Sequence, residues 1–177
     1  VAIVTELRVA DDRFKEGQVR PTGRGTFGVS GISLEKEDRV VSMEMLSQGA
    51  GLLTVAENGY GKRTAIEEYR LQSRGGKGII TMKTTEKTGR VIGVHQVTDD
   101  DQLMMVANKG KIIRLRVKDI STIGRNTQGV RLIEMEDGER VVAVARLAEM
   151  TASFCYGSKI LIAPGIMRLP LTLSWTG

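Results

Sequence analysis

Three copies of one short segment, spaced about fifty residues apart, place the strongest constraint on what this chain can fold into. The copies are TGRGTFGV (22–29), QSRGGKGI (72–79) and IGRNTQGV (123–130), and each holds an arginine and a glycine at the same places. A second landmark, an arginine followed by two aliphatic residues, recurs in phase at Arg39, Arg90 and Arg140. A fixed period of this length indicates a repeat protein, in which each unit buries its apolar surface against its neighbours.

Short apolar or alternating runs, separated by turns that contain glycine, fill the second and third repeats. The second repeat predicts strands at 52–56, 61–66, 79–83 and 91–97, with Asn58-Gly59 as a hairpin turn. The third predicts strands at 103–107, 111–117, 130–135 and 141–147. Four short strands per repeat indicate an all-β fold of four-stranded antiparallel blades, arranged as in a propeller or pinwheel. The 21 glycines and three prolines suit such a turn-rich fold.

The two ends of the chain fit the repeat less well. The opening hairpin of the first repeat should occupy about 2–12, but the expected turn glycine is missing, so residues 1–12 are interpreted as a damaged or truncated hairpin. The sequence predicts a first blade at 1–47, a second at 48–98 and a third at 99–149. Residues 150–177 form an atypical tail, in which 154–163 are a candidate for one further hairpin.

Composition favours a reducing compartment and a polyanionic partner. The 26 lysines and arginines against 21 acidic residues give a net charge of +5, a modest excess whose local placement matters more than its total. Cys155 is the only cysteine, so no disulfide within the chain is expected. The opening VAIVTELRVADD has acidic residues where a secretory leader is basic, and no apolar run nears the roughly 20 residues that span a bilayer. We therefore expect a soluble cytoplasmic protein without a membrane partner.

The repeated loop combines the residue types that bind phosphate. Glycine lets backbone amides approach phosphate oxygens, arginine adds a planar fork of donors, and lysine adds a point charge. The second copy, Gln72-Ser73-Arg74-Gly75-Gly76-Lys77-Gly78, carries all three. Because repeated loops lie on one face or rim of such folds, we expect Arg24, Arg74 and Arg125 to form a row suited to a long polyanion. Solvated glycine turns are the alternative interpretation.

Further basic residues precede these loops and would widen the row into a band. Each of them fits an ordinary solvated strand face equally well; they are Arg20, Lys62, Arg63, Arg70, Lys111, Arg114, Arg116 and Lys118. Aromatic residues make up only 4% of the chain, so no platform for stacking single-stranded bases is evident. The pattern favours contact with the backbone of double-stranded DNA and little reading of its base sequence.

Catalytic groups are sparse, so the chain alone is not expected to be an enzyme. His95 lies in an apolar run and is interpreted as structural, and Cys155 has no histidine or basic cluster nearby and is interpreted as a buried thiol. Residues 99–101 (Asp-Asp-Asp) fit a solvated turn better than a cation site, and no metal-ligand spacing is present. Tyr60 and Tyr69 are conceivable nucleophiles, yet each fits a strand or turn of a blade.

Several segments resemble the C-terminal domain of the DNA gyrase A subunit. They are RFKEGQVRPTGRGTFGVSGISL (13–34), ENGYGKRTAIEEYRLQSRGGKGI (57–79) and QLMMVANKGKIIRLRVKDISTIGRNTQGVRLI (102–133). The resemblance covers roughly 13–149 and implies a β-pinwheel, usually closed from six blades, whose basic rim wraps duplex DNA. In that family, wrapping supports the ATP-dependent introduction of negative supercoils.

The resemblance also implies which parts of the enzyme lie elsewhere. It assigns the DNA-cleaving tyrosine to the N-terminal part of the A subunit, whereas the ATPase lies on the gyrase B subunit, so no cofactor is expected on this chain. The family's signature is a QRRGGKG-like box in the first blade. Here Ser73 stands at a usually basic position, in a context similar to a later blade. Only about three blades are present, which would weaken full wrapping and leave open sheet edges.

Two other functions fit parts of the pattern. The C-terminal domain of topoisomerase IV, which steers the choice of DNA segments, is the close alternative, and the RGGKG copy and the GYGKRT context favour gyrase. A β-propeller scaffold that binds proteins is the alternative from another class. Such a scaffold would bind through a partly apolar face and tolerate salt, whereas binding to a DNA backbone should be lost at high salt.

Overall fold

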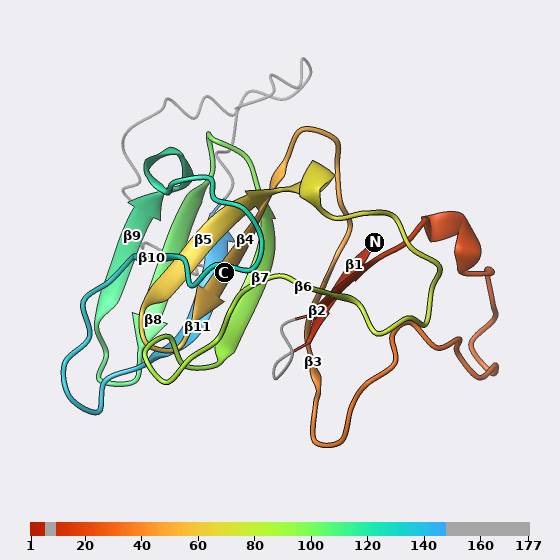
Figure 1. Ribbon diagram of the computed structural model, residues 1–177, viewed down its shortest axis with the longest axis horizontal. Coiled ribbons are helices and arrows are strands. Elements are labelled where there is room, and N and C mark those ends of the chain that lie inside the picture. Colours follow the sequence, from red (N-terminus) through yellow and green to blue (C-terminus); the bar gives the residue numbers. More distant parts are fainter. Residues whose placement is uncertain (6–9, 148–177) are drawn as a thin grey trace, which may run out of the picture.

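The computed structural model describes residues 1–5 and 10–147, whose secondary structure consists of β-strands and three short 3₁₀ turns (Figure 1). No helix of this described part is long and apolar enough to cross a membrane. All strand pairs are antiparallel, which confirms the predicted all-β fold. The strands are β1 (Ala2–Thr5), β2 (Ala10–Arg13), β3 (Val40–Glu44), β4 (Gly51–Ala56), β5 (Tyr60–Ala65), β6 (Ile79–Ile80), β7 (Val91–Val97), β8 (Gln102–Ala107), β9 (Ile112–Arg116), β10 (Val130–Arg131) and β11 (Val141–Leu147).

The three 3₁₀ turns follow the second strand of each repeat. They are η1 (Glu16–Gln18), η2 (Ile66–Glu68) and η3 (Val117–Asp119), and each leads into one of the repeated basic loops. Because the same turn recurs at the same phase, it delivers the second and third loops to equivalent places beside the sheets.

Each of the first two sheets takes its outer strand from the following repeat, which corrects the expectation that one repeat supplies all four strands of a blade. β6 pairs with β2, with Ile80 opposite Ala10, and β10 pairs with β5, with Val130 opposite Gly61. The first sheet therefore has the order β3-β1-β2-β6, and the second has the order β10-β5-β4-β7. In the part of the chain that the structure describes, the third sheet has only β11-β8-β9.

The two exchanged strands are shorter than the sequence predicts. The predicted strand 79–83 pairs only over β6, because the next residues bond to the following repeat: Asn126 N–H donates to Thr81 O, and Lys83 N–H donates to Thr127 O. The predicted strand 130–135 pairs only over β10, after which the chain turns inward and buries Ile133. Docking of the third repeat thus ends β6, and the inward turn that buries Ile133 ends β10.

The two strands of the first hairpin are present and paired, so the interpretation of residues 1–12 as a truncated hairpin is wrong, and the residues between the strands, 6–9, lie outside the described part. β1 and β2 pair in register from Ala2–Arg13 to Val4–Asp11, and all four residues of β1 are buried. An apolar strand covered on both faces holds its pairing without a glycine turn. The predicted divisions at 47, 98 and 149 stay predictions about the repeats, and the candidate hairpin 154–163 lies outside the described residues.

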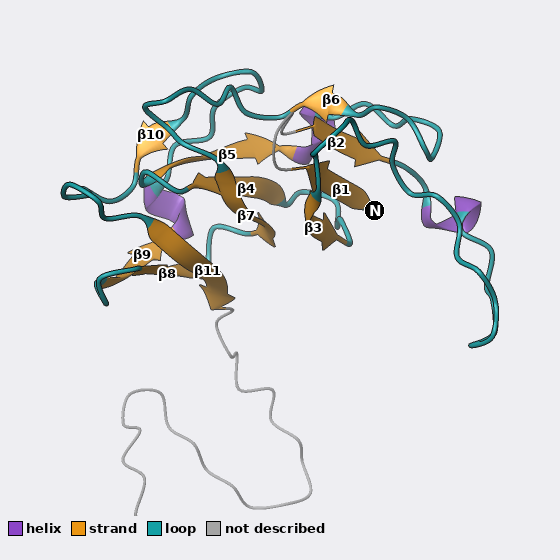
Figure 2. Cartoon of the chain, turned by 90° about the horizontal axis from the view of Figure 1, so that it is seen from below, coloured by secondary structure: helices purple, strands orange, loops and turns teal. Residues whose placement is uncertain are grey.

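Two apolar clusters fill the spaces between neighbouring sheets. Leu52 belongs to the cluster shared with the first sheet and Leu53 to the cluster shared with the third, and both side chains are fully buried. β4 is apolar along its length because sheets cover both of its faces. β8, in the last sheet, instead alternates buried and half-buried residues. Figure 2 shows the sheets arranged side by side in one row.

Candidate nucleic-acid interface

The glycine-rich loop of the second repeat is fixed against the first repeat by its own backbone amides. Arg74 N–H donates to Gln18 Oε1 at 2.8 Å, Gly75 N–H to Gly31 O at 2.9 Å, and Gly76 N–H to Asp12 Oδ2 at 3.1 Å. These three amides are therefore engaged inside the protein, which corrects the expectation that they face phosphate oxygens. The positive φ angles of Gly75 (84°) and Gly78 (74°) give the loop the bends that this docking requires.

The loop of the third repeat docks on the second repeat in the same way. Arg125 N–H donates to Glu68 Oε2 at 3.0 Å, and Asn126 N–H donates to Thr81 O at 3.2 Å. Asn126 and Gly129 have positive φ, matching Gly75 and Gly78 in the earlier copy. A Cβ at Gly129 would lie 2.5 Å from Gly61 O, so this position admits only glycine without displacement. Both described junctions thus use one mode of docking.

A buried ionisable side chain lies beneath each docked loop. Lys62 on β5 is fully buried, and its Nζ donates to Gly124 O at 2.7 Å and Thr127 Oγ1 at 3.1 Å. Burial lowers the pKa of this ammonium to about 8; Glu68 opposes the shift and Arg125 adds to it. Asp12 holds the equivalent place under the second loop, and burial raises its pKa although the amides of Gly76 and Gly75 oppose the rise. Lys62 is therefore not available for surface contact with DNA, contrary to the prediction.

Most of the other predicted basic residues lie at the surface. Seven of them are exposed: Arg20, Arg24, Arg70, Lys77, Arg114, Arg116 and Lys118. Arg116 is paired with Asp119 at 2.9 Å, but both side chains remain largely in solvent, where such a pair contributes little. Exposed guanidinium and ammonium groups supply the donors and the positive charge that phosphate contact requires.

Three predicted arginines are partly committed to the protein. A guanidinium nitrogen of Arg74 donates to Ser30 O, and the guanidinium of Arg125 lies 5.9 Å from the centre of the Tyr69 ring. Arg63 pairs with Asp99 and donates through Nε to Thr122 Oγ1 at 2.9 Å, with only 15% of its side chain exposed. These residues brace the loops, and Arg74 and Arg125 keep half-buried side chains at the loop surface.

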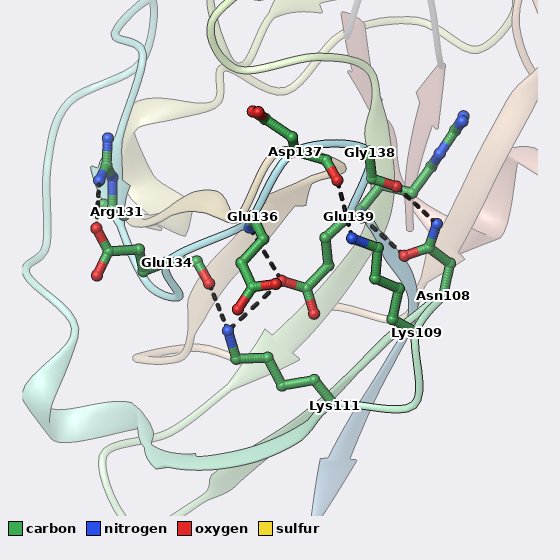
Figure 3. Close-up of polar contacts among 10 residues, drawn as sticks. Asn108, Lys109, Lys111, Arg131, Glu134, Glu136, Asp137, Gly138 and Glu139 are labelled. Carbon is green, nitrogen blue, oxygen red and sulfur yellow. Dashed lines mark hydrogen bonds and ion pairs between the residues drawn. The ribbon is translucent and has the colours of Figure 1, made fainter.

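Lysines of the hairpin between β8 and β9 are tied to an acidic turn, as Figure 3 shows. Lys111 Nζ donates to Glu134 O at 2.8 Å and lies 3.5 Å from Glu139 Oε2, and Lys109 Nζ donates to Asp137 O at 2.8 Å. The backbone amide of Glu136 lowers the pKa of the Glu139 carboxyl, with Lys111 and Lys109 contributing. Lys111 therefore belongs to this turn, so its predicted part in the basic band is not supported.

Sequence reasoning missed the side chains that hold the loops and two cations beside them. Gln18 and Glu68 end η1 and η2, and Asp119 ends η3, so an oxygen-bearing side chain recurs at one phase, and that recurrence was the available signal. The missed cations are Lys83, which follows the exchanged strand β6, and Arg131, which lies on β10. Both are exposed. No pattern in the sequence marks them.

The candidate catalytic residues of the described part have structural roles, and Cys155 lies outside that part. His95 on β7 places Nδ1 3.2 Å from Glu44 Oε1 and Nε2 3.3 Å from Val144 O, so it links the inner strands of all three sheets, in agreement with the structural interpretation. Tyr69 is buried, and Tyr60 accepts a hydrogen bond from Arg131 that lowers its pKa. Asp101 caps its turn by accepting from Thr98 N–H at 2.7 Å. Within 1–5 and 10–147 no cluster of three or more metal-ligating residues occurs.

The docked loops lie along one rim of the array. In Figure 2 the exchanged strands β6 and β10, together with the loops that precede them, occupy the upper rim of the row of sheets. Repeated four-stranded sheets joined by strand exchange, with a basic loop carried on each, define a propeller-type repeat domain.

Comparison with known proteins assigns this domain to a family. The family model described as "DNA gyrase C-terminal domain, beta-propeller" matches residues 13–47, 52–98 and 101–148, and the chain belongs to that family. The DNA gyrase A subunit of Klebsiella oxytoca is 51% identical over 138 residues, that of Escherichia coli K12 is 50% identical over 137, and that of Staphylococcus epidermidis is 49% identical over 139. Each alignment covers 77% of this chain but 16% of the relative, so the chain spans about a sixth of the length of these curated relatives.

Solved structures have the same fold. The structure titled "Structure of DNA gyrase A C-terminal domain" superposes with a TM-score of 0.74 at 28% identity, covering 82% of this chain and 49% of that one. The crystal structure of the C-terminal domain of DNA topoisomerase IV gives a TM-score of 0.76 at 23% identity, covering 83% of this chain and 46% of that one. The second likeness is evidence for the fold alone.

Proposed function

We propose that this chain is a duplex DNA-binding module that contacts the phosphate backbone without reading base sequence and bends the duplex along its rim. The observation that carries the proposal is the docking of a basic loop in the same way at both described junctions. Gln18 and Glu68 hold Arg74 and Arg125 at equivalent places, so successive loops present cations at a regular spacing. Regularly spaced cations complement a polyanion whose charges recur along its length.

The contact falls to side chains, because the loop amides are engaged within the protein. Arg24 and Lys77 are the most available loop cations, and the exposed cations on the neighbouring strands and turns extend the charged surface. Among the aromatic residues of 1–5 and 10–147, only Phe27 is exposed, so a base-stacking platform is absent there. Backbone contact without base readout is the mode that remains.

The energetics of this mode are dominated by counterion release. Each neutralised phosphate contributes a slope of about −0.9 to log K against log salt, so the seven exposed cations named above would contribute at most about −6. Bending a site of 20–30 base pairs costs a few kcal/mol, which these contacts have to offset.

In a larger enzyme, the module would be one region of the A subunit of a gyrase, which also contains the B subunit. The sequence identity of 51% to a DNA gyrase A subunit over 138 residues supports this assignment. Wrapping by the module would then bias the strand crossings that an ATP-driven enzyme converts into negative supercoils on chromosomal DNA in the cytoplasm. Cleavage and ATP hydrolysis would reside on other parts of that assembly.

The C-terminal domain of topoisomerase IV is a second candidate, because that domain has the same fold. In that role the module would bind duplex DNA but steer the enzyme's choice of segments without strong wrapping. Both candidates predict binding that is sensitive to salt, and they differ in whether bound DNA changes its writhe.

The test is a salt titration of binding to linear duplexes of unrelated sequence. We expect Arg24/Arg74/Arg125→Ala to weaken binding to all sequences alike and to flatten the salt slope by up to about three units. The matched control is Arg39/Arg90/Arg140→Ala, which removes the same charge at another repeated position and should retain most of the affinity. Equal loss in both variants, or a loss confined to one sequence, would contradict the proposal.

A further inference from the structure

The junction between consecutive repeats joins an acceptor surface to a donor surface. In the described residues, one acceptor surface and one donor surface are left without a counterpart. The acceptor surface is the edge of a second strand with the 3₁₀ turn that follows it. The donor surface is the basic loop with the two residues after it. β2 accepts the donor of the second repeat, and β5 accepts the donor of the third. The edge of β9 and the segment 22–31 remain.

The edge of β9 has the backbone geometry of an acceptor. At the junction between the second and third repeats, called the inner junction below, Leu132 N–H donates to Gly59 O and Ile123 N–H donates to Arg63 O, both at 2.8 Å. The equivalent positions beside β9 are Gly110 and Arg114. Ala107 N–H donates to Lys111 O and Val117 N–H to Asp101 O, so by antiparallel alternation the backbone groups of Ile112 and Arg114 point to the open edge.

The side chains at this edge also fit an incoming loop. Asp119 ends η3 at the place where Gln18 and Glu68 accept the amide of a loop arginine. Ile112 is 63% exposed, an unusual state for a large apolar side chain on a sheet edge. An edge of this kind is a template for another strand.

The segment 22–31 has the form of a donor that is not docked. Thr26 Oγ1 donates to Gly23 O at 2.8 Å, the same internal bond that Thr127 Oγ1 makes to Gly124 O at 3.0 Å in the docked third loop. Phe27 is 96% exposed, and Val29 stands where β6 and β10 begin. The loop therefore keeps its shape while its apolar residue faces solvent.

Donor and acceptor match in size. At the inner junction a Cβ at Gly61 would lie 2.5 Å from Leu132 Cδ1. The acceptor strand therefore has its smallest residue opposite a large side chain of the donor. At the open surfaces the order is reversed, because Ile112 takes the position of Gly61 and Gly31 takes the position of Leu132. Gly31 brings no side chain to compete with Ile112 for the space between the strands.

We propose that the edge of β9 binds the segment 22–31 of a second copy of this chain. The two surfaces lie at opposite ends of the row of sheets in Figures 1 and 2, so one copy cannot join its own ends in this arrangement. This chain covers 49% of the solved gyrase A C-terminal domain, so two copies joined at both ends equal that domain in size. The expected assembly is a closed head-to-tail dimer.

Sedimentation velocity of the full 177-residue chain, from about 1 to about 100 µM, tests the proposal. We expect the mass to approach twice 19.3 kDa as the concentration rises. Ile112→Pro removes the edge N–H of the acceptor, and Val29→Pro removes the pairing N–H of the donor. Each variant alone should stay monomeric. Their equimolar mixture should regain a weaker dimer, because one intact donor and one intact acceptor remain.

Ile112→Lys provides a second acceptor variant that leaves the backbone unchanged, with Ile80→Lys as its control. Ile80 is an exposed isoleucine of β6 in the middle of the array, so Ile80→Lys should dimerise like the parent chain. Circular dichroism melting checks that every variant is folded. A parent chain that stays at 19.3 kDa, or variants that dimerise as strongly as the parent, would overturn the proposal.

Discussion

Replacing Lys62 by methionine should destabilise the protein by an amount that grows with pH. The side chain is fully buried, and its Nζ holds the third loop through Gly124 O and Thr127 Oγ1. Methionine fills a similar volume without a donor, so both acceptors lose their partner. Above its pKa the amine is neutral, and two hydrogen bonds from a neutral donor contribute about 2 kcal/mol together.

The pH dependence follows from the lowered pKa. Burial moves the pKa of Lys62 to about 8 from an ordinary 10.5, so between these values the unfolded chain binds more protons than the folded chain. Stability of the parent protein therefore rises with pH through that window, and below it the burial of charge opposes folding. The full pKa shift corresponds to a change in unfolding free energy of at most about 3 kcal/mol. We reduce this to about 2 kcal/mol, because the loop that covers Lys62 lies at the surface and solvent screens the charge.

These terms combine to a loss of about 2 kcal/mol near pH 10, which falls toward zero at pH 7, where the buried charge opposes folding of the parent protein. Urea unfolding of the parent and of Lys62→Met, followed by circular dichroism across this range, measures the difference. Lys36→Met, which removes an exposed lysine, should show no such trend. A difference in unfolding free energy that is flat with pH, or that shrinks above pH 8, would refute the assignment of Lys62 as a buried brace.

Three further predictions concern the loops. Glu68→Ala should weaken DNA binding several-fold, because Arg125 loses its amide anchor, whereas Glu68→Gln should retain affinity in the same titration. Gly129→Ala should cost at least about 2 kcal/mol in urea unfolding, whereas Gly138→Ala, also at positive φ but in open space, should cost about 1 kcal/mol; equal costs would contradict the close packing against Gly61. Lys77→Ala should lower the salt slope by about one unit, and an unchanged slope would remove Lys77 from the contact surface.

Strands β7 and β11 were predictable because their own residues determine where each strand begins and ends. β7 and β11 match the predicted 91–97 and 141–147, since each is an apolar or alternating run bounded by turn residues. The exchanged strands β6 and β10 were not, because their length depends on contacts between repeats that lie about 40 to 70 residues apart in the sequence. Local pattern does not record which repeat supplies the partner strand.

Within the candidate site, residue type was predictable but orientation was not. The cationic positions Arg24 and Lys77 were identified from the repeat and are exposed. Lys62 stands in a strand with polar neighbours and resembles a solvated lysine, yet the loop of the following repeat covers it. The direction of the Arg74 and Gly76 amides depends on Gln18 and Asp12, which lie 56 and 64 residues earlier, and no local rule reports such a contact.

Ligation of nicked DNA circles in the presence of the chain tests the central claim most directly, because trapped writhe is preserved as a change in linking number. A module that binds and wraps duplex along its rim should shift the topoisomer distribution in one direction in proportion to the bound chain. That shift should be lost in Arg24/Arg74/Arg125→Ala and retained in Arg39/Arg90/Arg140→Ala. Tight binding with no shift at saturation would contradict wrapping and favour the segment-selecting role. An absence of binding at low salt would contradict the DNA-binding account itself.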